Sequence, residues 1–228
     1  MLTWPHGWQV NVLFALRWTH LLSGTLWLGL VLFFDRVWRR FLEEADRDTA
    51  SRARRLLEPR LLVWYEGAGF LTVGTGFIDY ALVLSAEGLA SRALVWLAVW
   101  SLAAGAVHAL LWLSARGRAL GDGRLLGAAL AAWLAAVGAS GDWYMSRGGS
   151  HKAVALSLGG GFALVMLANV WLILGPMSRR VLAALPAPEP QWERAVSLAS
   201  RLNLWLSPAV LFFMGSASHL PFFRTLER

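Results

Sequence analysis

The stretch LVWLAVWSLAAGAVHALLWL, residues 94–113, decides the fold class. Its only ionisable side chain is His108, and nearly all of its other residues are apolar. A helix rises about 1.5 Å per residue, so about 20 apolar residues cross the ~30 Å hydrocarbon core of a bilayer. The stretch is therefore predicted to be a membrane-spanning helix.

Similar apolar runs recur along the chain. Of its 228 residues, 57% are hydrophobic and 15% are charged, whereas soluble domains contain roughly 25% charged residues. We expect an all-α, multi-pass integral membrane bundle that forms one transmembrane domain over residues 1–228. Its six predicted membrane-spanning helices lie near residues 12–34, 61–84, 92–115, 124–142, 152–175 and 202–221.

Lysine and arginine are distributed unevenly between the loops that join these helices. Of the 21 lysines and arginines, fifteen fall within 35–60, 116–124 and 179–201, which alternate onto one side of the membrane. Cytoplasmic loops carry an excess of these residues, so both termini are predicted to lie outside the cytoplasm. This distribution also accounts for the net charge of +7, and we expect no nucleic-acid partner. Segment 35–60 mixes charges with leucines, which predicts an amphipathic cytoplasmic helix or helical hairpin.

The chain contains no cysteine, which excludes thiolate-held zinc, iron–sulfur clusters and covalently attached haem c. Histidines on facing helices hold b-type haem in helical bundles. We therefore expect haem b as the cofactor of a cytochrome-b-like protein. The candidate ligands are His20, His108, His151 and His219, and His20 with His219 is the preferred pair for the iron.

The first predicted span carries ionisable residues at an energetic cost of about 2.5–3.5 kcal/mol each. Two interpretations of its small residues remain open. They mark close packing against another helix, or they leave space for a cofactor ligated by the histidine, with the arginine bound to a haem propionate. The residues that share this helix face, by i, i+3, i+4 and i+7 spacing, are Arg17, His20, Ser23, Gly24 and Trp27.

A second group of polar residues lies toward the cytoplasmic ends of the predicted spans: Glu66, Asn169 and Asn203. Glu66 lies about one turn inside its span, where a long side chain reaches the interface. Alternatively, it forms a proton or quinone site with His108 and Asn203. Both interpretations remain open at this point.

Four motifs in order resemble the membrane domain of bacterial cytochrome-c-type urate oxidases. They are RWTHLLSGTLWLG (17–29), VWYEGAGFLTVGTGF (63–77), LGGGFALVMLANVWLILGPMSRRVL (158–182) and NLWLSPAVLFFMGSASHLP (203–221). The resemblance implies a place in the bacterial inner membrane. It also implies functional roles for Arg17, His20, Trp27, Glu66, Asn169, Asn203, Pro208 and His219.

The chain departs from that family at Ser157, where the resemblance implies a histidine, and its 228 residues contain no CxxCH motif. Three functions therefore remain open. The first is a haem-binding redox protein that passes electrons toward a periplasmic cytochrome c. The second is a urate-oxidase-like membrane enzyme with a separate cytochrome acceptor. The third is a non-catalytic membrane subunit of a larger respiratory or photosynthetic complex. The expected partners are membrane lipids and a cytochrome c or other redox-complex subunits.

Overall fold

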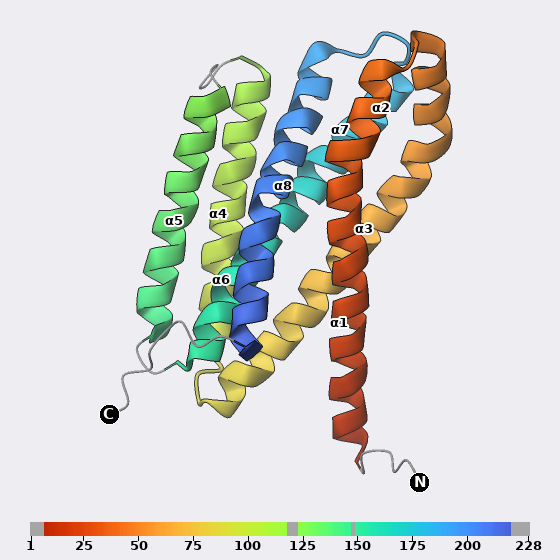
Figure 1. The fold of residues 1–228 in the computed structure, drawn as a ribbon. Helices are drawn as coiled ribbons and strands as arrows, with labels where there is room; N and C mark the ends of the chain where they lie inside the picture. Colours follow the sequence, from red (N-terminus) through yellow and green to blue (C-terminus); the bar gives the residue numbers. More distant parts are fainter. Residues whose placement is uncertain (1–6, 118–122, 147–148, 220–228) are drawn as a thin grey trace.

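The computed structural model describes residues 7–117, 123–146 and 149–219, and every regular element within these ranges is a helix. Five helical stretches are long and apolar enough to cross a membrane. Figure 1 shows the helices arranged as one bundle. The prediction of a helical membrane bundle is therefore confirmed in its general form.

The N-terminal part of the bundle is a long helical hairpin. Helix α1 (Trp8–Leu32) continues without a break through the π-helix η1 (Phe33–Trp38) into α2 (Arg39–Glu44). Helix α3 (Arg47–Ala86) then returns along α1. Asp46 begins α3, because its Oδ1 accepts hydrogen bonds at 3.0 Å from the backbone N–H groups of Asp48 and Thr49. An N-cap of this kind supplies acceptors that the first helical turn lacks.

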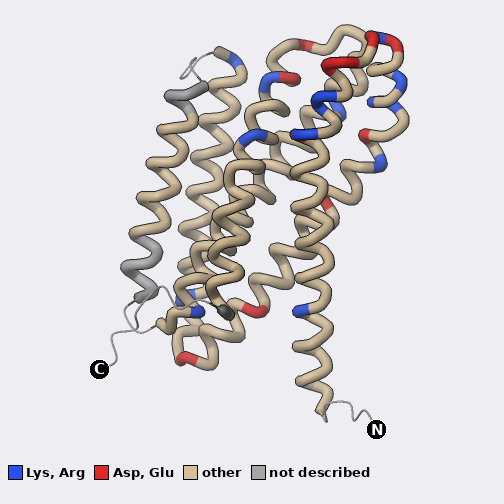
Figure 2. The backbone as a smooth tube through the Cα atoms, in the orientation of Figure 1, with Lys and Arg blue, Asp and Glu red and all other residues tan. Residues whose placement is uncertain are grey.

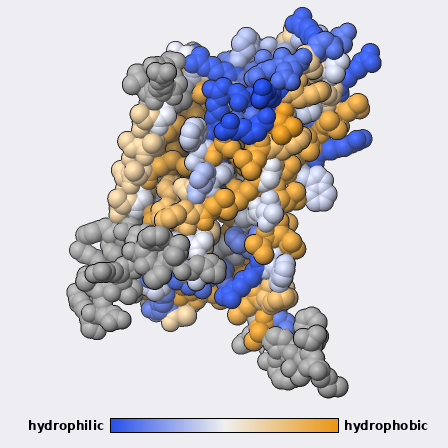
Figure 3. Space-filling view, viewed as in Figure 1, coloured by the Kyte–Doolittle hydropathy of each residue, from blue (hydrophilic) through white to orange (hydrophobic). Residues whose placement is uncertain are grey.

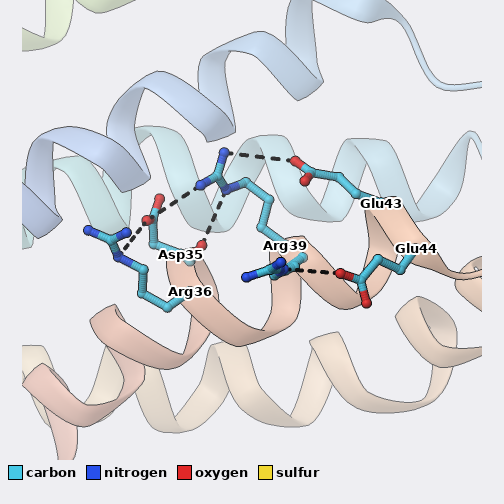
Figure 4. Close-up of polar contacts among 6 residues, drawn as sticks. Asp35, Arg36, Arg39, Glu43 and Glu44 are labelled. Carbon is cyan, nitrogen blue, oxygen red and sulfur yellow. Dashed lines mark hydrogen bonds and ion pairs between the residues drawn. The ribbon is translucent and has the colours of Figure 1, made fainter.

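Segment 35–60 forms the tip of this hairpin, and its charges pair with one another. Arg39 lies 3.7 Å from Asp35 and 3.8 Å from Glu43, and Arg40 lies 3.0 Å from Glu44 (Figure 4). Residues four apart on a helix are neighbours, so the sequence spacing alone brings these charges together. Figure 2 shows that most charged residues of the bundle gather at this end.

The remaining helices are α4 (Arg92–Ala115), α5 (Gly123–Ser146), α6 (His151–Asn169), the π-helix η2 (Val170–Leu174), α7 (Gly175–Ala183) and α8 (Pro190–His219). Helix α6 lies at the centre, where it packs against α3, α4, α5 and α8. Its glycines allow this close packing. A Cβ atom at Gly161 would overlap the indole ring of Trp100, which is itself fully buried.

The fourth predicted span, 124–142, falls on α5. This helix is 24 residues long, but the apolar stretch within its described part, Gly127–Ala139, is shorter than a membrane span. The five longer apolar stretches correspond to the other five predicted spans. The count of six membrane crossings therefore stays a prediction.

Candidate functional site

A cavity of about 540 Å³ lies between α1, α3, α6 and α8. Small-molecule sites typically have volumes of 300–1,000 Å³. Helix α1 packs mainly on α3 and has little contact with α8, and in Figure 1 its N-terminal half diverges from the other helices. The exposed side chains of Leu21 and Leu211 line this gap. Figure 3 shows an apolar surface over the middle of the bundle, which is compatible with contact with lipid.

His20 of α1 lines the cavity, and α3 fixes the position of its ring. Nδ1 lies 2.9 Å from the carbonyl oxygen of Thr72 and 3.2 Å from Oγ1 of Thr75. Since a carbonyl oxygen only accepts, Nδ1 carries the proton. Gly76 provides the space, because a Cβ atom there would lie 2.8 Å from Cε1 of the ring. Both hydrogen bonds use Nδ1, which leaves Nε2 for a ligand or a metal.

Two cationic side chains, Arg17 and Lys152, also line the cavity. Nε of Arg17 lies 3.4 Å from Oδ1 of Asp79, a contact that leaves the two terminal amino groups of the guanidinium for another partner. Both cations suit an anionic group such as a haem propionate. Arg17 is predicted for this role from the sequence. Lys152 is not, because its place at the end of a predicted span makes it resemble an orientation signal.

The small residues of the α1 face have different roles. Ser23 packs α1 against α3: its hydroxyl donates to the carbonyl of Thr19 at 2.6 Å and accepts from Thr72 Oγ1 at 3.0 Å. Gly24 and Trp27 line the cavity. Trp27 is 1% exposed, and within the described part of the chain its Nε1 has no hydrogen-bond partner. Helix packing and cavity formation thus occur on the same face.

None of the other histidine side chains described in the structure lines this cavity. His151, at the start of α6, has Nε2 3.0 Å from the carbonyl oxygen of Ser216, and His108 lies on α4. His219 is the last residue of α8, next to Ser218 in the cavity wall, but its side chain lies outside the described residues. Pairing of His20 with His219 therefore stays a prediction.

Met214 of α8 also lines the cavity, and methionine sulfur serves as an axial haem ligand in some proteins. The sequence interpretation does not include this residue, because methionine is common in apolar helices. Over the described ranges, no cluster of three or more His, Cys, Asp or Glu side chains is arranged to hold a metal ion.

Glu66 lies away from the cavity, in an ion pair between α3 and α7. Nη2 of Arg179 lies 2.7 Å from Oε1 and 2.6 Å from Oε2 of Glu66. Gly175 leaves room for this pair, because a Cβ atom there would overlap Oε1. The charge partner of Glu66 is thus Arg179. This contact does not support the alternative in which Glu66 forms a proton or quinone site with His108 and Asn203.

Asn169 and Asn203 join α6 to α8 in the buried core. Nδ2 of Asn169 donates to Oδ1 of Asn203 at 3.0 Å, and Nδ2 of Asn203 donates to the carbonyl of Met166 at 3.1 Å. Both asparagines are at most 1% exposed. The Met166 carbonyl, which accepts from Asn203, lies just before η2. Side chains that insert into the backbone hydrogen bonds of a helix accompany such π-helical segments. This pair therefore supports the packing of two helices.

Comparison of the chain with protein-family models, curated proteins and solved structures finds no match. The likeness to urate oxidase membrane domains therefore rests on the four sequence motifs alone.

Proposed function

We propose that the chain is an integral membrane redox protein that holds b-type haem in the cavity between α1, α3, α6 and α8. The observation that carries the proposal is the fixed ring of His20 in the wall of a cavity of ligand size. Histidines that ligate metals usually donate their other ring N–H to a carbonyl or carboxylate. The Nδ1 contact of His20 with Thr72 has this form, which leaves Nε2 to ligate iron.

The other cavity residues fit the periphery of the same group. Arg17 and Lys152 would bind the propionates. Trp96 provides a flat aromatic wall, with Phe77 stacked at 5.8 Å and Tyr80 at 5.2 Å between ring centroids. Met214, which lines the cavity, or His219 would be the candidate for a second protein ligand. Bound haem would supply one-electron transfer, with a potential set by the axial ligands and by burial.

We also propose six membrane crossings, with α5 as the sixth and both termini outside the cytoplasm of a bacterial cell. The support is the concentration of arginines at one end of the bundle (Figure 2). The cavity residues Arg17 and Lys152 lie toward the opposite end, so a periplasmic cytochrome c would be the electron acceptor. A C-terminal alkaline phosphatase fusion should be active. An inactive fusion that is expressed at the same level would contradict this orientation.

The haem itself is tested by the absorption spectrum of the purified protein. We expect a Soret band, α and β bands on reduction, and a pyridine haemochrome typical of haem b. Expression should be supplemented with a haem precursor so that cofactor supply is not limiting. Protein purified under these conditions without a Soret band would contradict the proposal.

A further inference from the structure

A second hollow, of about 150 Å³, lies near the tip of the hairpin between η1, α2, α3, α7 and α8. We call it the tip pocket, and none of its lining residues lines the haem cavity. Phe34, Leu62 and Leu174 line it from within the predicted membrane spans, whereas Arg54 and Glu193 line it from outside them. The pocket is thus apolar toward the membrane and charged toward the cytoplasmic end. One water needs roughly 10–15 Å³, so the pocket has room for roughly ten water-sized groups.

Glu58 places a carboxylate with a free oxygen in the wall of the tip pocket. The residue is only 7% exposed. Trp38 Nε1 donates to Oε1 of Glu58 at 2.8 Å, and Nε of Arg54 lies 3.8 Å from the same oxygen. Among the described residues Oε2 has no such partner, and it keeps accessible surface, so a bound molecule can reach it. A buried carboxylate is costly unless its oxygens are paired, and a donor from a ligand would lower that cost.

Hydroxyl groups that bond to no other residue lie in the same pocket. Within the described ranges, three lining serines form no hydrogen bond through their side chains: Ser178, Ser197 and Ser200. Each hydroxyl can accept a hydrogen bond from a ligand. The pocket therefore offers several acceptors around one carboxylate oxygen.

Aromatic rings form part of the pocket wall beside this carboxylate. Phe34, Trp38 and Tyr65 all line the pocket, and the ring centroids of Phe34 and Tyr65 are 5.3 Å apart. Aromatic faces attract cations, and sites for organic ammonium groups use such rings. The wall therefore suits a ligand that joins a positive charge to an apolar body.

The ion pairs around the tip pocket leave an excess of negative charge. Arg54 is shared between two carboxylates, because its Nη1 lies 3.0 Å from Glu193 and its Nε contacts Glu58. Arg39 is also shared between two carboxylates (Figure 4). The connected set contains three arginines and four carboxylates: Arg36, Arg39, Arg54, Asp35, Glu43, Glu58 and Glu193. The other arginines that the structure describes do not line the pocket, and salt screens exposed charges over about 8 Å. A bound cation would balance this set.

We propose that the tip pocket binds a small primary amine with an apolar body, whose ammonium group donates to Oε2 of Glu58. The three N–H donors of an ammonium group match the carboxylate oxygen and the serine hydroxyls around it. The apolar body lies against the rings and aliphatic side chains toward the membrane. An anion would meet the excess negative charge, and a neutral molecule would leave it unbalanced. This site goes beyond the proposed function and does not depend on haem.

The test is calorimetric titration of the full chain, purified in an uncharged maltoside detergent, with phenethylamine. Two probes keep the phenyl ring: 2-phenylethanol carries a hydroxyl in place of the ammonium group, and 3-phenylpropionate carries the opposite charge. We expect both to bind at least about tenfold more weakly than phenethylamine. Glu58→Gln keeps an acceptor for Trp38 but removes the charge, and it should weaken phenethylamine binding about 10- to 100-fold, the loss of one hydrogen bond to a charged group.

Glu44→Gln is the matched control, because Glu44 is an exposed glutamate at the same end that does not line the pocket. The proposal is overturned if Glu58→Gln binds phenethylamine as tightly as Glu44→Gln, or if 2-phenylethanol binds the parent protein equally well. The second comparison needs no variant, so it decides the question even if Glu58→Gln fails to fold.

Dihexanoyl phosphatidylethanolamine presents the same ammonium group on a lipid and is titrated as well. Tighter binding of this lipid than of phenethylamine, lost in Glu58→Gln, would overturn the assignment to a free amine. The haem spectrum should be the same in the parent protein and in both variants. Amine binding without haem contradicts only the haem proposal, whereas haem without Glu58-dependent amine binding contradicts only this inference.

Discussion

At the arginine-rich end of the bundle, Arg39 and Arg40 each contact a carboxylate, and Arg54 contacts both Glu58 at 3.8 Å and Glu193 at 3.0 Å. In the cavity half, by contrast, the hydrogen bonds of His20 use one ring nitrogen, and the contact of Arg17 with Asp79 uses one of its nitrogens.

The polar groups of the two regions therefore differ. Those at the arginine-rich end mostly pair with one another, whereas those in the cavity half keep atoms that a ligand can contact. Ion pairs four residues apart on an exposed helix contribute only about 0.3–0.5 kcal/mol each, and they form wherever the spacing allows. Side chains that line an apolar cavity and keep unused hydrogen-bond donors contribute less to the stability of the fold. Their unused donors are available to a bound molecule. Outside the tip pocket, the arginine-rich half should therefore respond to mutation in stability, and the cavity half in ligand binding.

The largest loss of stability should come from Gly175→Ala, which breaks the ion pair between Glu66 and Arg179. The added methyl group overlaps Glu66 and crowds Arg179, whose Nη1 would lie 3.0 Å away. Overpacking of this kind destabilises a protein by about 1–3 kcal/mol. A value toward the upper end is expected here, because the backbone carbonyl oxygen of Val170 would lie 3.2 Å from the added Cβ and leaves it little room. The measurement is the free energy of unfolding in mixed detergent micelles. Gly67→Ala is the control, since nothing lies within 4 Å of a Cβ there, and equal stability of the two variants would contradict the account.

A somewhat smaller loss of stability is expected for Asn203→Leu. The substitution keeps the branched shape of the side chain but leaves the amide of Asn169 and the carbonyl of Met166 without their partner. Unsatisfied buried polar groups cost about 1–3 kcal/mol, so we expect a loss of about 2 kcal/mol in the same unfolding assay. Ser207→Ala is the control, because its hydroxyl donates to the carbonyl oxygen of Asn203 on its own helix. An Asn203→Leu protein as stable as Ser207→Ala would show that the asparagine pair is dispensable.

Gly76→Ala should weaken haem binding rather than stability. A Cβ atom there would lie 2.8 Å from Cε1 of His20, so the ring must move from its position in the cavity wall. We expect about tenfold weaker haem binding, equivalent to about 1.4 kcal/mol, in a haem titration of the purified apoprotein. Gly74→Ala, two residues earlier on α3 with open space around its Cβ, should bind haem normally. Equal affinities for the two variants would mean that the position of His20 does not matter.

The smallest effect concerns the hairpin tip and its dependence on pH. Hydrogen bonds from the side chain and backbone of Thr49 lower the pKa of Asp46 below its ordinary value of 3.8. The folded-state pKa is thus below the unfolded one, so the contribution of Asp46 is present above about pH 3.8 and is lost as pH falls through the folded value. The protection of the Asp48 and Thr49 amides against exchange, relative to their intrinsic exchange rate at each pH, should fall over that range, and Asp46→Ala should remove this pH dependence. Unchanged protection down to the pH of global unfolding would contradict it.

Hydropathy predicts the bounds of a membrane span well where the helix ends together with its apolar stretch. The predicted span 92–115 coincides with α4. The span predicted to begin near residue 61 belongs to a helix that begins at Arg47 and passes through Pro59. The charged residues before 61 hide that extension from a hydropathy analysis, and a proline inside a helix usually indicates a break. Neither π-helical segment follows a sequence pattern that predicts it.

From the sequence, the candidate site could be predicted only for those of its residues that lie on the same helix. The spacing of Arg17, His20 and Trp27 places them on one face of α1, and all three line the cavity. The partners that fix them come from other helices: Thr72 bonds His20, and Arg179 bonds Glu66 across 113 residues of sequence. Such pairs depend on which helices become neighbours, and one sequence read by periodicity does not provide that information.

The most direct test of the haem proposal compares the haem-to-protein ratio of His20→Ala with that of His108→Ala. Both residues are histidines inside apolar helices, but only His20 lines the cavity. The account predicts that His20→Ala loses the Soret band while remaining folded, and that His108→Ala keeps the spectrum of the parent protein. An unchanged spectrum in folded His20→Ala would contradict the central claim that this histidine ligates the iron.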